Sequence, residues 1–183
     1  METETSRLGS QDALCALLQA RVLLETETPL KKDCGKLCAG ACCRTDEGEE
    51  NGMWLFPHEE TLYQDPIEGF PFRLEKDETV WPGGCRLICE GSCLRAHRPL
   101  ACRLFPLRLR PAACGTGISV EPEIDPRAWA LCPLPEQCGG RLNALQGSFV
   151  QSVRTAGDLL VRNADLLVFL NAEQQWLDET RVL

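Results

Sequence analysis

The chain has 183 residues, of which 44% are hydrophobic and 25% are charged, as in soluble globular proteins. Its net charge of −8 argues against a main role in binding nucleic acid or anionic membranes. Twelve cysteines, against two histidines and one tyrosine, direct any side-chain chemistry towards sulfur.

Helices are expected at both ends of the chain. Between residues 11 and 25, apolar side chains recur at helical spacing without an intervening Gly or Pro. Cys15 lies inside this segment, and we expect it to pack in the core because free cysteine is among the most buried residue types. Further helical patterns cover 142–160 and 165–177, as two helices or as one bent helix.

The middle of the chain is rich in Cys, Gly and Pro. Short strands are expected at 53–56, 104–110 and 117–124, with a hairpin between 72–74 and 79–81. The expected fold class is therefore α+β, mostly α, with a small, irregular, cysteine-rich, metal-centred core and short strands, flanked by an N-terminal helix and C-terminal helices. We expect a single domain over 1–183, in which 30–140 form the metal-binding core and 141–183 the helical segment.

The cellular compartment decides what the cysteines mean. The start of the chain, from Met1 to Arg7, is acidic and polar and does not resemble a secretory signal peptide. No segment reaches the roughly 18 apolar residues of a membrane span. We therefore expect a cytoplasmic protein that binds neither membrane nor nucleic acid, and whose clustered thiols bind metal rather than form disulfides. A disulfide-rich exported protein ranks last among the alternatives.

A short repeat links two cysteine-rich blocks. Cys34–Cys42 and Cys85–Cys93 both read Cys-x-x-aliphatic-Cys-x-Gly-small-Cys. In the first block, Cys34 and Cys38 are one helical turn apart, and Gly40 allows a sharp turn before Cys42-Cys43. Zinc and iron–sulfur clusters take thiolate ligands, typically four, which must converge on one point.

The second block adds positive charge to its cysteines. It holds Cys85, Cys89, Cys93 and Cys102 together with Arg86, Arg95, Arg98, Arg103, Arg108 and Arg110. Four thiolates around a dication carry a net negative charge, which nearby guanidinium groups would stabilise. The alternative is that these arginines are solvated or pair with carboxylates. Cys132 and Cys138, which flank Pro-Leu-Pro-Glu-Gln, are candidate further ligands.

Two motifs resemble those of the bacterial YkgJ-like group, also called the CxxCxxCC family, which is described as a zinc- or iron-chelating domain. The first is Cys34-x3-Cys38-x3-Cys42-Cys43, and the second is Arg98-Pro-Leu-Ala-Cys102-Arg103-Leu-Phe-Pro106, preceded by Cys93. The resemblance implies a metal- or cluster-chelating role for Cys34, Cys38, Cys42, Cys43, Cys93 and Cys102. The first motif departs from the family by having three residues, where two are common, before its Cys-Cys pair.

The sequence therefore predicts a metal-binding cysteine-cluster protein that holds an iron–sulfur cluster or zinc and acts in electron transfer, metal handling or enzyme maturation. The candidate ligands are Cys34, Cys38, Cys42, Cys43, Cys85, Cys89, Cys93, Cys102, Cys132 and Cys138, with Arg98 and Arg103 in support. One alternative is a structural zinc module that binds a protein partner. Another is a thiol-redox or modifying enzyme, which the absence of a Cys-x-x-Cys pair makes weaker.

Overall fold

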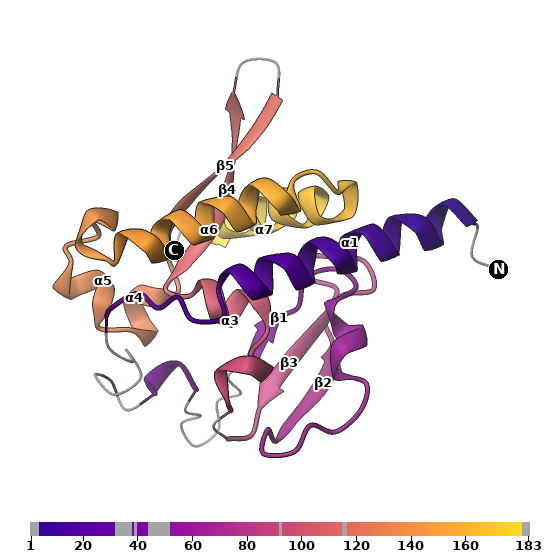
Figure 1. Ribbon diagram of the computed structural model, residues 1–183, viewed down its shortest axis with the longest axis horizontal. Coiled ribbons are helices and arrows are strands. Elements are labelled where there is room, and N and C mark those ends of the chain that lie inside the picture. Colours follow the sequence, from indigo (N-terminus) through magenta and orange to yellow (C-terminus); the bar gives the residue numbers. More distant parts are fainter. Residues whose placement is uncertain are drawn as a thin grey trace.

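The computed structural model describes residues 4–31, 38, 40–43, 52–91, 93–114 and 117–180. The fold is about 48% helix and 20% strand, which confirms the predicted α+β class. Three long helices, α1 (Glu4–Leu23), α6 (Gly147–Leu160) and α7 (Ala164–Thr180), lie along one side of a small sheet, and a hairpin projects beyond them (Figure 1). In the part of the chain that is described, no helix combines the length and apolarity needed to cross a membrane.

Helix α1 buries a narrow apolar face. Ala13, Leu17 and Ala20 are fully buried, as their spacing of three to four residues requires. Cys15 lies on the opposite side and is exposed, so the expectation that it packs in the core is wrong. Its thiol accepts a hydrogen bond from the Gln19 side chain at 3.4 Å.

The two C-terminal helices are separate, because a turn intervenes after Leu160. The Asn163 side chain accepts hydrogen bonds from the backbone N–H groups of Asp165 and Leu166, at 3.0 and 3.2 Å. This is an N-cap, which starts α7 as a new helix.

The projecting hairpin consists of β4 (Leu107–Cys114) and β5 (Gly117–Ile124), paired antiparallel. The predicted strand at 117–124 is confirmed, whereas the one at 104–110 begins only at Leu107 because Leu104 still belongs to a helix. Gly157 of α6 lies against the hairpin, where a Cβ atom would come within 2.7 Å of Val120 and 3.0 Å of Leu109. The glycine therefore permits the close packing of helix on hairpin.

The other sheet has the order β1-β3-β2, with β1 (Gly52–Trp54), β2 (Phe72–Lys76) and β3 (Cys85–Cys89) all antiparallel. The predicted hairpin between 72–74 and 79–81 is wrong, because β2 pairs with β3 and residues 79–81 lie in the connection. Leu55, Tyr63, Phe70 and Leu87 form a small apolar cluster on this sheet, separate from the main core. Cys85, Cys89 and Cys93 pack at its margin.

Short helices connect these parts. They are η1 (Ala41–Cys43), η2 (Glu59–Tyr63), η3 (Arg95–His97), α3 (Leu100–Leu104), α4 (Ala128–Leu131), α5 (Leu134–Gln137) and η4 (Leu142–Ala144). The two copies of the cysteine repeat differ in conformation where both are described, since Cys38 is helical and its counterpart Cys89 ends a strand. Ring contacts tie the small sheet to α7, with Trp54 and Trp176 at 4.7 Å between centroids.

Candidate metal centre

Cysteines from three separate parts of the chain line one cavity of about 40 Å³. Cys42 and Cys43 come from η1, Cys89 and Cys93 from the end of β3 and the loop after it, and Cys102 from α3. Met53, Arg98, Pro99 and Phe105 complete the wall. Cys42-Cys43 of the first motif, Cys102 of the second motif and the end of β3 therefore meet at one place. Up to 60 residues separate them in sequence.

A second cavity, of about 50 Å³, adjoins the first. Cys42, Cys43 and Cys102 line both cavities, and the second adds Cys38 and Cys132. Arg98 also lines both. The structure thus brings seven of the ten predicted ligand cysteines to two adjoining spaces.

The local backbone explains how η1 presents two adjacent thiols. Gly40 has a positive φ of 70°, a conformation that glycine adopts without a steric penalty. The Cys43 N–H donates to the Gly40 carbonyl at 2.7 Å, which closes the turn. The sulfur atoms of Cys42 and Cys43 then lie 3.9 Å apart.

The two adjacent thiols differ in acidity. A hydrogen bond from Cys42 lowers the pKa of Cys43 to about 6, against the opposing effect of burial and with help from the Arg98 charge. The same hydrogen bond, followed by burial, raises the pKa of Cys42 above its usual range. One of the two is therefore the better thiolate before any metal arrives.

Burial holds the thiols of Cys89, Cys93 and Cys102 in the neutral form. Burial, followed by the charges of Cys93 and Cys43, raises the pKa of Cys89 to about 12. Burial also raises the pKa of Cys93, although Arg98 opposes it, and raises that of Cys102 well above the usual range. Metal binding would have to remove these protons.

Arg98 fits an anionic centre. Its guanidinium interacts with Cys93, Cys43 and Cys102, which raise its own pKa against the opposing effect of burial. Its Nε atom is buried and has no hydrogen-bond partner among the described residues. A metal surrounded by thiolates would give this charge a counterpart.

Arg103 and Arg95 act on carbonyl groups instead. Arg103 is buried and donates to the carbonyls of Arg98, Arg21 and Ala96, at 3.0, 2.9 and 2.6 Å. Arg95 donates to the carbonyls of Leu24, Glu25 and Glu27 after α1. Both therefore fasten the cysteine-bearing segment to α1.

Arg108 and Arg110 pair with carboxylates of β5, Glu123 and Glu121, each at 2.7 Å. Arg86 lies 3.9 Å from Asp77. The alternative role considered for the arginines, pairing with carboxylates, thus holds for part of the cluster.

Three predicted ligands are not placed at these cavities. Cys34 lies outside the described residues. Cys85 begins β3, four residues before Cys89, so their Cα atoms are roughly 13 Å apart along an extended strand. Cys138 is buried after α5, where its thiol donates to the Pro135 carbonyl at 3.5 Å.

Sequence reasoning missed a buried polar network that positions α3. Glu59 is fully buried and accepts hydrogen bonds from the Leu100 N–H at 2.7 Å and from Arg21 at 3.0 Å. Tyr63 accepts from Arg21 at 2.7 Å and donates to the His97 carbonyl at 2.9 Å. The local sequence His58-Glu59-Glu60 looks like a solvated acidic turn, so no signal in it could have identified this role.

The donor set fits a soft metal, because the polar side chains of the cavity are thiols beside the buried Arg98 Nε, which has no hydrogen-bond partner among the described residues. Within the described residues, no three Cys, His, Asp or Glu side chains are grouped closely enough to hold an ion as they stand. The thiols would therefore have to approach one another as a metal binds.

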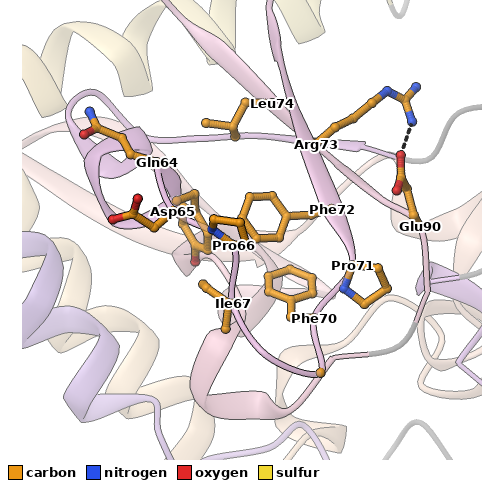
Figure 2. A pocket seen from close by; sticks show the side chains of 12 residues that line it. Gln64, Asp65, Pro66, Ile67, Phe70, Pro71, Phe72, Arg73, Leu74 and Glu90 are labelled. Carbon is orange, nitrogen blue, oxygen red and sulfur yellow. Dashed lines mark hydrogen bonds and ion pairs between the residues drawn. The ribbon is translucent and has the colours of Figure 1, made fainter.

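A larger cavity lies away from the thiols. It has a volume of about 590 Å³ and opens beside β2 and the segment after η2 (Figure 2). Ile67, Phe70, Phe72 and Leu74 supply its apolar wall, and the ion pair between Arg73 and Glu90, at 3.1 Å, lies at its rim. None of the described cysteines lines this space.

Comparison with protein-family models, with curated proteins and with solved structures finds no match to this chain. The resemblance to the YkgJ-like family therefore rests on the motif residues alone.

Proposed function

We propose that this chain binds metal through the thiolates that line the two adjoining cavities, either as zinc or as an iron–sulfur cluster. The observation that supports this most directly is the convergence of Cys38, Cys42, Cys43, Cys89, Cys93, Cys102 and Cys132 from separate segments. Apolar packing does not require thiols from so many segments to meet. A soft metal that is bound by several thiolates requires them to converge on one point.

The protein's own residues have distinct roles in this proposal. Cys43, whose pKa is lowered by the hydrogen bond from Cys42, offers a thiolate near neutral pH. Arg98 offsets the negative charge that accumulates as further thiols lose their protons. Arg103 and Glu59 act as positioning residues, because they fix α3 and hence Cys102. The bound metal or cluster would serve electron transfer, metal handling or enzyme maturation.

The test is elemental analysis of protein purified without oxygen, together with its absorption spectrum and an assay of acid-labile sulfide. Iron with matching sulfide would identify a cluster protein, and zinc without sulfide a zinc site. Cys102→Ser is expected to lower the metal content, whereas Cys15→Ser, on the exposed side of α1, is the matched control and should retain it. Absence of any metal from the wild-type protein would refute the proposal.

The second candidate function is a zinc-stabilised module that binds a protein segment, and the free edge of β2 favours it. The Glu90 N–H donates to the Pro71 carbonyl and the Asp77 N–H to the Gly84 carbonyl. Because antiparallel ladders alternate, Phe72 and Leu74 direct their backbone N–H and C=O groups away from β3. The described residues supply no backbone partner for those groups, which border the cavity of about 590 Å³. An extended peptide could add there as a fourth strand.

Asp65, Glu90 and Arg73, which forms an ion pair with Glu90, leave one net negative charge at the cavity, and this charge favours a peptide with alternating apolar and basic residues. A capped hexapeptide of alternating Val and Lys is therefore a suitable probe, with binding followed by NMR shifts of the Phe72 and Leu74 amides. Leu74→Pro removes an outward N–H without touching the ladder to β3, and it should abolish binding. Unperturbed β2 amides at saturating probe would eliminate this candidate.

A further inference from the structure

We propose that Cys42 and Cys43 form a modification site for hydroperoxides, at which hydrogen peroxide converts the two thiols into a reversible disulfide. Their sulfur atoms lie 3.9 Å apart. Oxidation of a dithiol needs two sulfur atoms that can reach each other, and it needs no third ligand group. Cys42 is exposed and Cys43 is half-buried, so an oxidant from solvent can reach the pair. The oxidation itself does not depend on a bound metal.

The covalent geometry of the pair suits a modification that is easily reversed. The Cα atoms of adjacent residues lie about 3.8 Å apart. Ordinary disulfides join Cα atoms that are at least roughly 4.4 Å apart, and shorter separations strain the bond. Strained disulfides are the ones that thiols reduce readily. A disulfide between Cys42 and Cys43 would therefore be a labile, regulatory one rather than a structural one.

The space beside the pair admits a hydroperoxide. Cys42, Cys43 and Arg98 line both of the adjoining cavities, which measure about 40 and 50 Å³. A water molecule needs a cavity of roughly 10–15 Å³, so either space has room for the two oxygen atoms of hydrogen peroxide. The oxidant can therefore lie next to both thiols and to the guanidinium group at once.

Arg98 supplies the charge that peroxide cleavage needs. Its Nε atom is buried and has no hydrogen-bond partner among the described residues. This group can donate to a peroxide oxygen, where a charged donor stabilises the negative charge that develops as the O–O bond breaks. Arg98 is an electrostatic neighbour of Cys43, and Cys42 is the more exposed of the two thiols. Cys43 is therefore the attacking thiol, and Cys42 is the resolving thiol.

The reaction proceeds in two balanced steps. The Cys43 thiolate attacks one peroxide oxygen, so that an S–O bond forms, the O–O bond breaks, and the other oxygen leaves as hydroxide. The hydroxide takes the proton that Cys43 released and becomes water, while Cys43 becomes a sulfenic acid. The Cys42 thiol then loses its proton and attacks the Cys43 sulfur. The S–S bond forms, the S–O bond breaks, and a second water leaves.

The disulfide has a consequence for metal that rests on the proposed function. Cys42 and Cys43 are the two thiols of η1 that line both cavities. Their oxidation removes two thiolates from the candidate ligands at once. Oxidised protein should therefore bind less Zn²⁺ than reduced protein, and a thiol reductant should restore the binding.

The experiment treats reduced, metal-free full-length protein with hydrogen peroxide and maps the product by mass spectrometry. The tryptic peptide 37–44 holds Cys38, Cys42 and Cys43, and it should lose the mass of two hydrogen atoms. Cys38→Ser should leave this loss in place, and dithiothreitol should reverse it. Loss of the signal in Cys38→Ser would assign the disulfide to Cys38 and overturn the proposal.

Further variants test the role of each side chain. Cys42→Ser should stop the reaction at the sulfenic acid, which dimedone traps on Cys43. Arg98→Gln should slow the oxidation by about tenfold through loss of a charged donor. Cys15→Ser, on the exposed side of α1, is the control and should be oxidised at peptide 37–44 as fast as wild-type protein. Circular dichroism identifies any variant that fails to fold, and the wild-type peptide map is then decisive.

The possible failures are distinguishable. An unchanged peptide 37–44 in wild-type protein overturns the modification site, and so does a cross-link from Cys43 to a cysteine outside this peptide. An equal rate in Arg98→Gln overturns the role of Arg98. If the disulfide forms but reduced protein binds no metal, the proposed function fails and the modification site stands. Equal Zn²⁺ binding by oxidised and reduced protein overturns only the consequence for metal.

Discussion

The helical layer and the cysteine cavities are built on different principles. The core between α1, α6, α7 and the hairpin consists of apolar side chains, among them the fully buried Phe149, Leu160 and Leu166. The cavities are lined by thiols, and their walls are positioned by charged side chains that bind backbone carbonyls and amides. The helical layer therefore supplies stability through burial. The cavity region depends on a few directional contacts.

The largest expected effect separates the two regions by stability. Phe149 is fully buried in α6, so Phe149→Ala should lower the free energy of unfolding by about 3–5 kcal/mol through lost burial and a residual cavity. Chemical denaturation measures this loss. Metal bound per folded molecule should not change, and Val168→Ala, at an exposed position of α7, should have little effect on stability. A lower metal content in folded Phe149→Ala would mean that the two regions are coupled.

The second-largest expected effect is a dependence of metal affinity on pH, which should arise from the cavities alone. Raised pKa values keep Cys89, Cys93 and Cys102 protonated when metal is absent, and each must lose its proton to bind. Affinity should therefore rise with pH, and a fall from pH 7.5 to 6.5 should weaken Zn²⁺ binding by about 10³-fold, a factor of ten for each proton. Competition with a chelator of known affinity measures this change. Helical circular dichroism should stay constant over the range, and a flat affinity would contradict buried neutral thiols.

Substitution of Arg103 should lower both the stability of the fold and the affinity of the cavities for metal. Its guanidinium is buried and makes three hydrogen bonds to carbonyls, so Arg103→Ala should cost about 2–3 kcal/mol of stability. It should also weaken metal binding because α3 loses its anchor. Thermal or chemical denaturation provides the measurement. Arg110→Ala is the control, since its ion pairs with Glu121 and Glu123 lie at the surface and should each contribute below about 1 kcal/mol. Equal effects of the two substitutions would show that the carbonyl contacts are unimportant.

Arg98 should produce the smallest effect, and only on the metal. Arg98→Gln keeps a similar shape but removes the charge beside Cys43, Cys93 and Cys102. Loss of about 1 kcal/mol of electrostatic stabilisation would weaken Zn²⁺ binding about fivefold and leave the unfolding free energy of the metal-free protein nearly unchanged. Isothermal titration with a competing chelator resolves a change of this size. An unchanged dissociation constant would remove Arg98 from the site.

The sequence by itself determined much of the helical layer. Periodic apolar residues predicted helices at both ends, and the strand over 117–124 was bounded by Gly and Pro. These predictions succeeded because local periodicity and turn chemistry act over short segments. Periodicity could not place Cys15, since residues on both sides of α1 are apolar and only packing selects the buried face. It also missed the β2–β3 pairing, because strand partners are chosen by contacts distant in sequence.

For the site, the sequence identified thiols as the reactive groups, and it singled out the Arg98-to-Pro106 motif. Only the tertiary structure brought Cys89, Cys102 and Cys132 to two adjoining cavities and left Cys85 and Cys138 elsewhere. It also separated two neighbouring arginines, turning Arg98 towards the thiols and Arg103 towards carbonyls of α1 and η3. Side-chain type limits which ligands a protein can offer. Which of those side chains share a cavity is decided by long-range packing, and that information is not carried by any short stretch of the chain.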